Sequence, residues 1–192
     1  VKATVTVQPE RAKAISDVLL GAFFEDINYS ADGGLYAELI QNRDFEYDPS
    51  DREGDKNWNS THSWTLKGDK TTFTISTTDP IHANNPHYAV LNVERPGAAL
   101  ENTGFDGIAL NVGEKYDFSI FARVPQGQSN KLQVRLVDGE GNICGETSLT
   151  VSSRQWKTYK TVITAKATAD TRLEIIPQSA GELNLDMMQV FD

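Results

Sequence analysis

Three aromatic residues occur in polar, turn-rich surroundings, where a sugar ring can stack on them. Trp58 ends an acidic segment, Tyr88 follows a polar segment with two histidines, and Phe105 stands in a glycine-flanked turn. Aromatic rings bind the apolar C–H face of a sugar, while flanking polar groups bind its hydroxyls. The sequence therefore predicts Trp58, Tyr88 and Phe105 as carbohydrate contacts, with core packing as the alternative for Phe105.

Other residues whose side chains could take part in binding or catalysis indicate no separate site. Trp64 and Trp156 stand in strand-like patterns, and a lone Trp in a strand is usually packed in the core. The three histidines lie in loop segments at irregular spacing, without a third ligand for zinc. Cys144 is the only cysteine, which excludes an internal disulfide and a Cys-based zinc site.

The composition is that of an ordinary soluble globular protein, large enough for one domain or one domain with an appendage. Of 192 residues, 39% are hydrophobic and 23% are charged, and the net charge is −9. This charge argues against nucleic-acid or anionic-membrane partners, which require clustered Lys and Arg. No run is long enough for a transmembrane helix, and the N-terminus lacks the pattern of a signal peptide.

From Trp64 onward the chain alternates apolar and polar residues, which is typical of half-buried antiparallel strands. In Tyr116–Val124, for example, every second residue is apolar, so that one face of the strand can be buried. An Asp-Gly pair at 138–139 suits a hairpin turn. About nine or ten strands over ~145 residues predict an all-β, two-sheet jelly-roll sandwich of the galactose-binding-like type.

The first 43 residues have a different pattern. Val1–Val7 alternates and predicts an edge strand, whereas the apolar run Val18–Phe24 is typical of a strand buried on both faces in a parallel sheet. Leu35–Gln41 has apolar residues at helical spacing and predicts a short helix. We therefore predict an N-terminal segment, 1–43, and a jelly-roll module, 44–192.

Three motifs follow one another in the N-terminal stretch: GAFFE at 21–25, GGLYAE at 33–38 and NRDFE at 42–46. Together they resemble the N-terminus of glycoside hydrolase family 51 α-L-arabinofuranosidases. The last residues, 185–191, are similar to the segment that returns to the catalytic barrel in that family. The part between, with Trp64 and the strand 116–123, resembles jelly-roll carbohydrate-binding modules of families 4, 9 and 22.

The resemblance implies that this chain lacks the catalytic part of such an enzyme. A (β/α)₈ barrel needs about 250 residues, and Val18–Phe24 would be only its first strand. A retaining glycosidase needs two carboxyl groups about 5 Å apart, and the family's acid/base glutamate follows an asparagine. No Asn-Glu dipeptide occurs in the chain, so we expect no hydrolysis and no required cofactor.

The resemblance also implies roles for individual residues. Glu25, at the carboxyl end of the first barrel strand, would hydrogen-bond the arabinofuranose hydroxyls, with Asn28 as a weaker companion. Glu46 and Asp186 correspond to acids that hold a structural calcium ion in related jelly rolls, and calcium binds such hard oxygen ligands. The alternative for both acids is a solvated or Arg-paired carboxylate.

These points lead to one interpretation with one alternative. The chain is expected to be the non-catalytic, carbohydrate-binding part of an α-L-arabinofuranosidase that removes arabinofuranosyl groups from arabinan or arabinoxylan. Its partners would be an arabinose-containing plant polysaccharide and the missing barrel, in an extracellular or periplasmic setting. The alternative is a structural module packed on the barrel without sugar affinity of its own. Val18–Phe24 is then expected to dock on the jelly roll, pair with a neighbour or adopt a non-barrel conformation.

Overall fold

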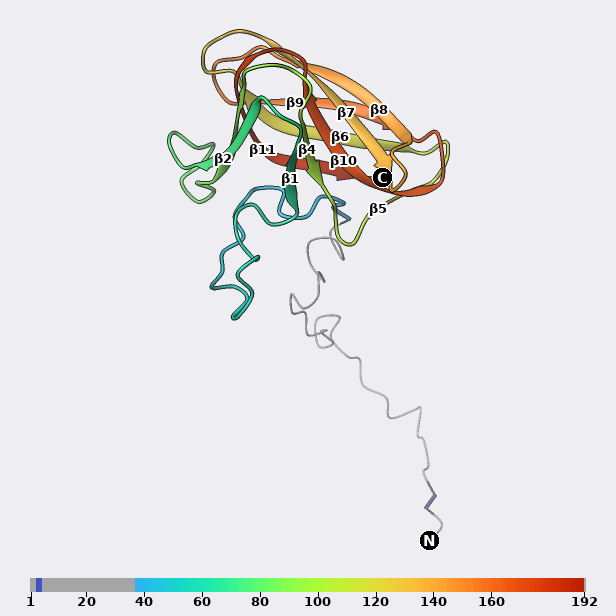
Figure 1. Ribbon diagram of the computed structural model, residues 1–192. Helices are drawn as coiled ribbons and strands as arrows, with labels where there is room; N and C mark the ends of the chain where they lie inside the picture. Colours follow the sequence, from blue (N-terminus) through green and yellow to red (C-terminus); the bar gives the residue numbers. More distant parts are fainter. Residues whose placement is uncertain (1–2, 5–36, 192) are drawn as a thin grey trace, which may run out of the picture.

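Two antiparallel β-sheets packed face to face make up the described part of the protein (Figure 1). The computed structural model describes residues 3–4 and 37–191. The strands are β1 (Trp64–Lys67), β2 (Thr71–Ser76), β3 (Tyr88–Val93), β4 (Ala99–Asn102), β5 (Ile108–Leu110), β6 (Lys115–Arg123), β7 (Asn130–Asp138), β8 (Ile143–Val151), β9 (Lys157–Thr164), β10 (Ala169–Pro177) and β11 (Gly181–Phe191).

Each sheet mixes strands from distant parts of the chain. One sheet has the order β2-β3-β11-β6-β9, and we call it the groove sheet. The opposite sheet has the order β1-β4-β10-β7-β8, with β5 paired to β10. The predicted all-β jelly-roll sandwich is confirmed, with eleven strands in the described residues instead of nine or ten.

The core lies between the two sheets and follows from the alternation in the sequence. In β6, Tyr116, Phe118, Ile120 and Ala122 are buried, whereas the residues between them face outward. The same alternation in β7 and β10 buries their aliphatic side chains from the other side. Trp64 is also buried, as its strand-like context predicts. Successive side chains of a strand point to opposite faces, so the outward residues of the groove sheet are free to form a surface.

The segment before β1 is bonded to the last strand. Leu39 N donates to Val190 O at 3.1 Å, and Val190 N donates to the carboxylate of Glu38 at 3.0 Å. Met188 N donates to Arg43 O at 3.1 Å, and Ile40 is buried in the core. The beginning and the end of 37–191 therefore lie side by side at one edge of the sandwich.

The predicted helix Leu35–Gln41 differs from the structure in its described part, 37–41, which is irregular and ends in a turn. The reason is that the backbone there bonds to β11 and to the Glu38 carboxylate, which also accepts from Ile40 N at 2.9 Å. Residues 37–43, which the sequence pattern groups with the N-terminal segment, thus pack on the sandwich. The predicted strand Val18–Phe24 lies outside the described residues, as does Val1–Val7 apart from residues 3–4.

A long loop, 46–63, leads from this segment to β1 and projects from the sandwich (Figure 1). Asn42, with a φ of 51°, ties the two ends of the loop together. Its side-chain amide donates to the carbonyl oxygens of Ser60 and His62 at 3.1 and 3.0 Å. Within residues 3–4 and 37–191, no helix is long and apolar enough to cross a membrane.

Candidate functional site

A groove of about 750 Å³ opens on the outward face of the groove sheet. Its floor comes from β2, β3, β6 and β11, and its walls come from the loops that follow β2, β6 and β8. The strand register places the outward residues of neighbouring strands in one row, with Thr74 opposite Val90, Val90 opposite Asn184, and Asn184 opposite Arg123. The lining residues are Thr74, Ile75, Ser76, Thr78, Asp79, Tyr88, Val90, Arg123, Pro125, Arg154, Gln155, Glu182 and Asn184.

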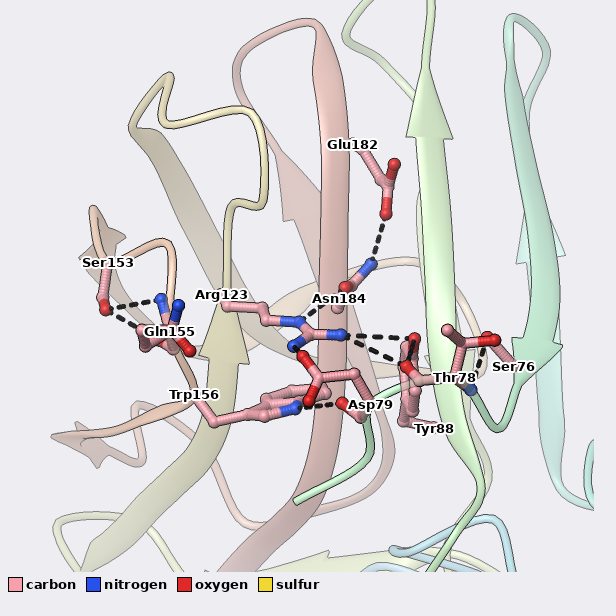
Figure 2. Close-up of polar contacts among 10 residues, drawn as sticks. All are labelled: Ser76, Thr78, Asp79, Tyr88, Arg123, Ser153, Gln155, Trp156, Glu182 and Asn184. Carbon is pink, nitrogen blue, oxygen red and sulfur yellow. Dashed lines mark hydrogen bonds and ion pairs between the residues drawn. The ribbon is translucent and has the colours of Figure 1, made fainter.

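Arg123 is the centre of the hydrogen-bond network in the groove (Figure 2). Its side chain is only 8% exposed. Its Nε donates to Asn184 Oδ1 at 2.8 Å, its Nη1 pairs with the Asp79 carboxylate, and its Nη2 donates to Tyr88 Oη at 3.3 Å. A buried cation is tolerated only when it is paired and hydrogen-bonded in this way. The network therefore fixes the guanidinium in one position.

Two aromatic rings hold the same guanidinium from its sides. The Arg123 Cζ lies 4.5 Å from the ring centroid of Trp156 and 5.4 Å from that of Tyr88. The two rings meet edge to face, with centroids 5.1 Å apart and planes at 82°. Cation–π contacts of a partly desolvated Arg contribute about 0.5–2 kcal/mol each. The floor of the groove is thus rigid before any ligand arrives.

The predicted exposure of Tyr88 is wrong, because this residue is 3% exposed. Its ring is covered by Trp156, and its hydroxyl donates to Thr78 O at 2.6 Å. Tyr88 nevertheless lines the groove. Trp156, which the strand-like context places in the core, is half-buried, and its Nε1 donates to Asp79 O at 3.0 Å. The rings of Tyr88 and Trp156 therefore stabilise the groove floor more than they offer an exposed surface on which a sugar ring could stack.

Further hydrogen-bond acceptors and donors line the groove. Asn184 Nδ2 donates to Glu182 Oε1 at 2.9 Å, which sets the orientation of both side chains. Gln155 is held in the turn after β8, where Ser153 Oγ donates to its carbonyl oxygen at 2.7 Å (Figure 2). Such a set of fixed polar groups on a concave surface is suited to binding hydroxyl groups.

The other two predicted aromatic contacts do not line the groove. Trp58 is half-buried within the loop 46–63, where it is stacked on Tyr47 with ring centroids 4.2 Å apart and packs against the His62 ring, which is tilted by 46°, at 4.8 Å. Arg52 lies 5.0 Å above the Trp58 ring. Phe105 is half-buried in its turn. A sugar contact of Trp58 or Phe105 stays a prediction, and Glu25 and Asn28 lie outside the described residues.

Glu46 and Asp186, the predicted calcium pair, are brought to the same region by the loop 77–87 between β2 and β3. Glu46 accepts from His87 N at 2.7 Å, and its other oxygen lies 2.6 Å from His87 Nδ1. Asp186 is fully buried and accepts from Asn85 Nδ2 at 3.0 Å and from Met187 N at 2.7 Å. Both acids are therefore hydrogen-bonded, and within the described part of the chain neither is paired with an arginine.

The electrostatics around Asp186 are unfavourable for its ionised form. The pKa of Asp186 is raised to about 8, chiefly by burial and also by the negative charges of Asp44 and Glu46, while the hydrogen bonds from Met187 and Asn85 act in the opposite direction. A cation near these acids would relieve the repulsion. In residues 3–4 and 37–191, no three His, Cys, Asp or Glu side chains form a group that could hold a metal ion. Any further ligands would thus have to be backbone or amide oxygens, which calcium accepts.

Of the lining residues given above, the sequence predicts only Tyr88 as a contact, and Arg123, Asp79 and Asn184 are among those that it does not single out. Their positions on the outward face follow from strand alternation, but their contacts do not. Arg123 is 44 residues from Asp79 and 61 residues from Asn184. The sequence offered one signal for this site, namely an arginine on the outward face at the end of a strand in which apolar residues alternate.

The chain is similar to arabinofuranosidases along nearly its whole length. It is 35% identical over 191 residues to an extracellular exo-α-L-arabinofuranosidase of Streptomyces chartreusis, which covers 98% of this chain and 22% of the relative. It is 24% identical to α-L-arabinofuranosidase 1 of Arabidopsis thaliana over 97% of this chain and 29% of the relative. The chain thus spans less than a third of the length of these relatives. The resemblance to the N-terminal region of such enzymes is confirmed.

Solved structures agree on the fold. An arabinose-bound family 51 α-L-arabinofuranosidase superimposes with a TM-score of 0.74 at 24% identity, over 88% of this chain and 28% of that one. The CBM22-1 xylan-binding domain from Paenibacillus barcinonensis Xyn10C gives 0.50 at 13% identity, over 68% and 86%. Residues 37–180 match the family described as "Carbohydrate binding domain". The chain therefore belongs to this family of carbohydrate-binding domains.

Proposed function

We propose that the chain binds carbohydrate in the groove of the groove sheet, as the non-catalytic part of an α-L-arabinofuranosidase. The observation that carries this proposal is the preformed polar floor around the buried Arg123, whose three guanidinium nitrogens bond to Asn184, Asp79 and Tyr88. Polar groups held in place before binding lose little entropy when a ligand arrives. Hydroxyl-rich ligands match the mixture of donors and acceptors along the rim.

Arabinan or arabinoxylan is the proposed ligand, and its arabinofuranosyl groups are the proposed target of the longer enzyme. The named relatives support this assignment, since they are arabinofuranosidases that extend well beyond the matched region. The Streptomyces relative is named as extracellular, which supports an extracellular setting here. The proposed partners are the polysaccharide and a catalytic barrel of the same longer protein.

A structural role is the second candidate function. It is favoured by the hydrogen bonds of Leu39 and Glu38 to Val190, which place both ends of the described chain at one edge of the sandwich. A module joined to a larger fold at this edge would be held in a fixed orientation. In this alternative the module supports the barrel and has no sugar affinity of its own.

We also propose a structural calcium ion near Glu46 and Asp186. The fully buried carboxylate of Asp186, with Asp44 and Glu46 raising its pKa, is the observation that favours a cation at this position. The ion would link the segment before β1 to the last strand and would act on stability. No step of sugar binding in the groove requires it.

Isothermal titration of the 192-residue chain with arabinan, arabinoxylan and their oligosaccharides tests the proposal. We expect binding that is lost when Asn184 and Glu182 are both replaced by alanine. A control variant at the outward face of the opposite sheet, Gln133→Ala, should bind normally. Absence of heat at millimolar sugar would exclude the binding function and favour the structural role.

A further inference from the structure

Asp79 has an exposed carboxylate and a left-handed backbone conformation, which contacts from other elements hold in place. Its side chain is 75% exposed, although it pairs with the nearly buried side chain of Arg123. Its φ is 54°, in the left-handed region, and the next residue is Pro80. Left-handed backbone is uncommon for non-glycine residues, of which aspartate and asparagine adopt it most readily, and proline further restricts the residue before it.

Two residues from other elements hold Asp79 in this conformation. Arg123, at the end of β6, binds one carboxylate oxygen, Oδ2, through Nη1. Trp156, just before β9, donates its indole N–H to the backbone oxygen of Asp79 at 3.0 Å. Figure 2 shows both contacts converging on this residue. Backbone strain that the surroundings impose in this way is commonest at functional sites.

Arg123 leaves part of the carboxylate available. Among residues 3–4 and 37–191, the only side-chain partner of Asp79 is Arg123, and only Oδ2 takes part. Asp79 also lines the groove. An ionised carboxylate has two oxygens with about four acceptor positions. Oδ1 is therefore an acceptor that Arg123 leaves available, on a groove-lining residue whose other oxygen is held by Arg123.

We propose that Asp79 is a specificity-determining sugar contact that accepts hydrogen bonds from two adjacent hydroxyl groups of a neutral sugar. This inference rests on the proposed carbohydrate-binding function of the groove. A carboxylate is acceptor-only and matches a pair of neighbouring O–H donors, and charge-assisted hydrogen bonds of this kind are the strong ones. Arg123 is the positioning residue, since it aims Asp79 and balances its charge.

The same arrangement disfavours acidic sugars. Asp79 and Glu182 both line the groove, whereas the cation Arg123 is already paired with Asp79. At the floor, the carboxylate of a uronic acid would meet these two acids and an arginine that is already paired, because the second arginine of the groove, Arg154, stands in the wall that follows β8. The chemical class of the ligand is therefore a neutral glycan with vicinal hydroxyls.

The test compares Asp79→Asn with a matched control, Asp69→Asn. Asp69 is similarly exposed, at 81%, and faces Arg95 at 3.8 Å in the turn between β1 and β2, outside the groove. Asparagine tolerates left-handed backbone and keeps an acceptor for Arg123. We expect D79N to melt within about 2 °C of the wild type and to bind an arabinofuranosyl-substituted xylotriose at least about tenfold more weakly, whereas D69N binds normally.

A second measurement distinguishes a direct contact between Asp79 and the ligand from a role of Asp79 in supporting its own loop. Each protein is titrated with deoxy analogues of the same oligosaccharide, which lack one hydroxyl of a vicinal pair. The wild type should bind one of these analogues more weakly than the parent oligosaccharide. D79N should bind the two equally, because this variant already lacks the hydrogen bond to the missing hydroxyl. A glucuronic acid substituent should weaken binding to the wild type more than to D79N.

The possible results decide between distinct conclusions. Equal affinity of D79N and the wild type for the neutral ligand would overturn the role of Asp79 while leaving the groove as the binding site. Loss of affinity without any coupling to the deoxy analogues would assign Asp79 to loop support and also overturn it. A wild-type chain that binds none of these sugars would overturn the proposed function itself.

Discussion

The carboxylate of Glu38 joins the segment before the sandwich to its last strand by accepting the backbone N–H of Val190 at 3.0 Å, across 152 positions of sequence. The same oxygen accepts from Ile40 N at 2.9 Å. Both residues are buried. One side chain therefore satisfies two backbone donors that water cannot reach, and a buried donor without a partner is costly.

Replacement of Glu38 by alanine should destabilise the protein by about 2–4 kcal/mol, because it leaves two buried N–H groups unpaired. E38Q keeps an oxygen acceptor and should cost less than E38A. Urea unfolding followed by fluorescence measures both values. As a control, the exposed Glu53→Ala in the loop 46–63 should change stability by less than about 0.5 kcal/mol. Equal stability of E38A and the wild type would show that these bonds do not hold the edge of the sandwich.

Arg123 should be needed for both the groove and the environment of Trp156. In R123M the Asn184, Tyr88 and Asp79 contacts disappear together with the cation over the indole ring. We expect a stability loss of about 1–3 kcal/mol, since the variant removes hydrogen bonds and a cation–π contact but leaves Asp79 solvated. Sugar affinity should fall at least about tenfold, because Asp79 is no longer aimed at the ligand and the loss of one charge-assisted hydrogen bond already accounts for a change of that size.

R95M is the matched control for R123M. Arg95 is 70% exposed and faces the exposed Asp69, so this variant should keep both stability and sugar binding. The indole emission of R123M should change, while that of R95M should not. An R123M protein with wild-type affinity would contradict the assignment of the groove as the binding site.

The strand pattern was predictable from the sequence because alternation is local. In β6 the inward positions of Tyr116, Phe118 and Ile120 follow from the period of two alone. The alternating stretch Tyr116–Val124 predicts this strand to within one residue at each end, since β6 spans Lys115–Arg123. The resemblance to arabinofuranosidases was equally readable, since its motifs are short and contiguous.

Side-chain exposure within the candidate site was not predictable, because it depends on partners far apart in sequence. Tyr88 lies in polar surroundings along the chain, yet it is covered by Trp156, the residue just before β9. Asp186 stands next to two methionines, but its pKa depends on Asn85, 101 residues away, and on the acids at 44 and 46. Only the sheet topology brings these residues together.

Asp186 should make the stability of the metal-free protein decrease as the pH rises. Its pKa is about 8 in the folded state, against the ordinary value of 3.8 that applies to the unfolded chain. The folded state therefore binds the extra proton between these values, so the stabilisation is complete below pH 4 and is lost as the pH rises through 8. In the presence of a chelator, the free energy of unfolding should fall by about 3 kcal/mol between pH 5 and pH 7.5.

The variant D186N isolates this effect, because an amide does not titrate and still accepts the Met187 N–H. The difference between the unfolding free energies of the wild type and D186N should therefore change with pH in the direction just given. Urea titrations at half-unit pH steps measure it. A difference that is constant from pH 5 to 7.5 would mean that Asp186 is ionised in the folded protein over this range.

Calcium should remove the same pH dependence and raise the melting temperature. An ion bound near Glu46 and Asp186 favours the ionised carboxylates, and a ligand that binds only the folded state stabilises it by about 2.7 kcal/mol at a hundred times its dissociation constant. We therefore expect EDTA to lower the melting temperature at pH 7.5, and calcium, but not magnesium, to restore it. D186N should not respond, whereas the control E146Q, which changes an acid on the opposite sheet, should respond like the wild type. Identical melting of the wild type in EDTA and in millimolar calcium would exclude the ion. The hydrogen bonds of Asn85 and His87 would then be the link between these acids and the loop 77–87.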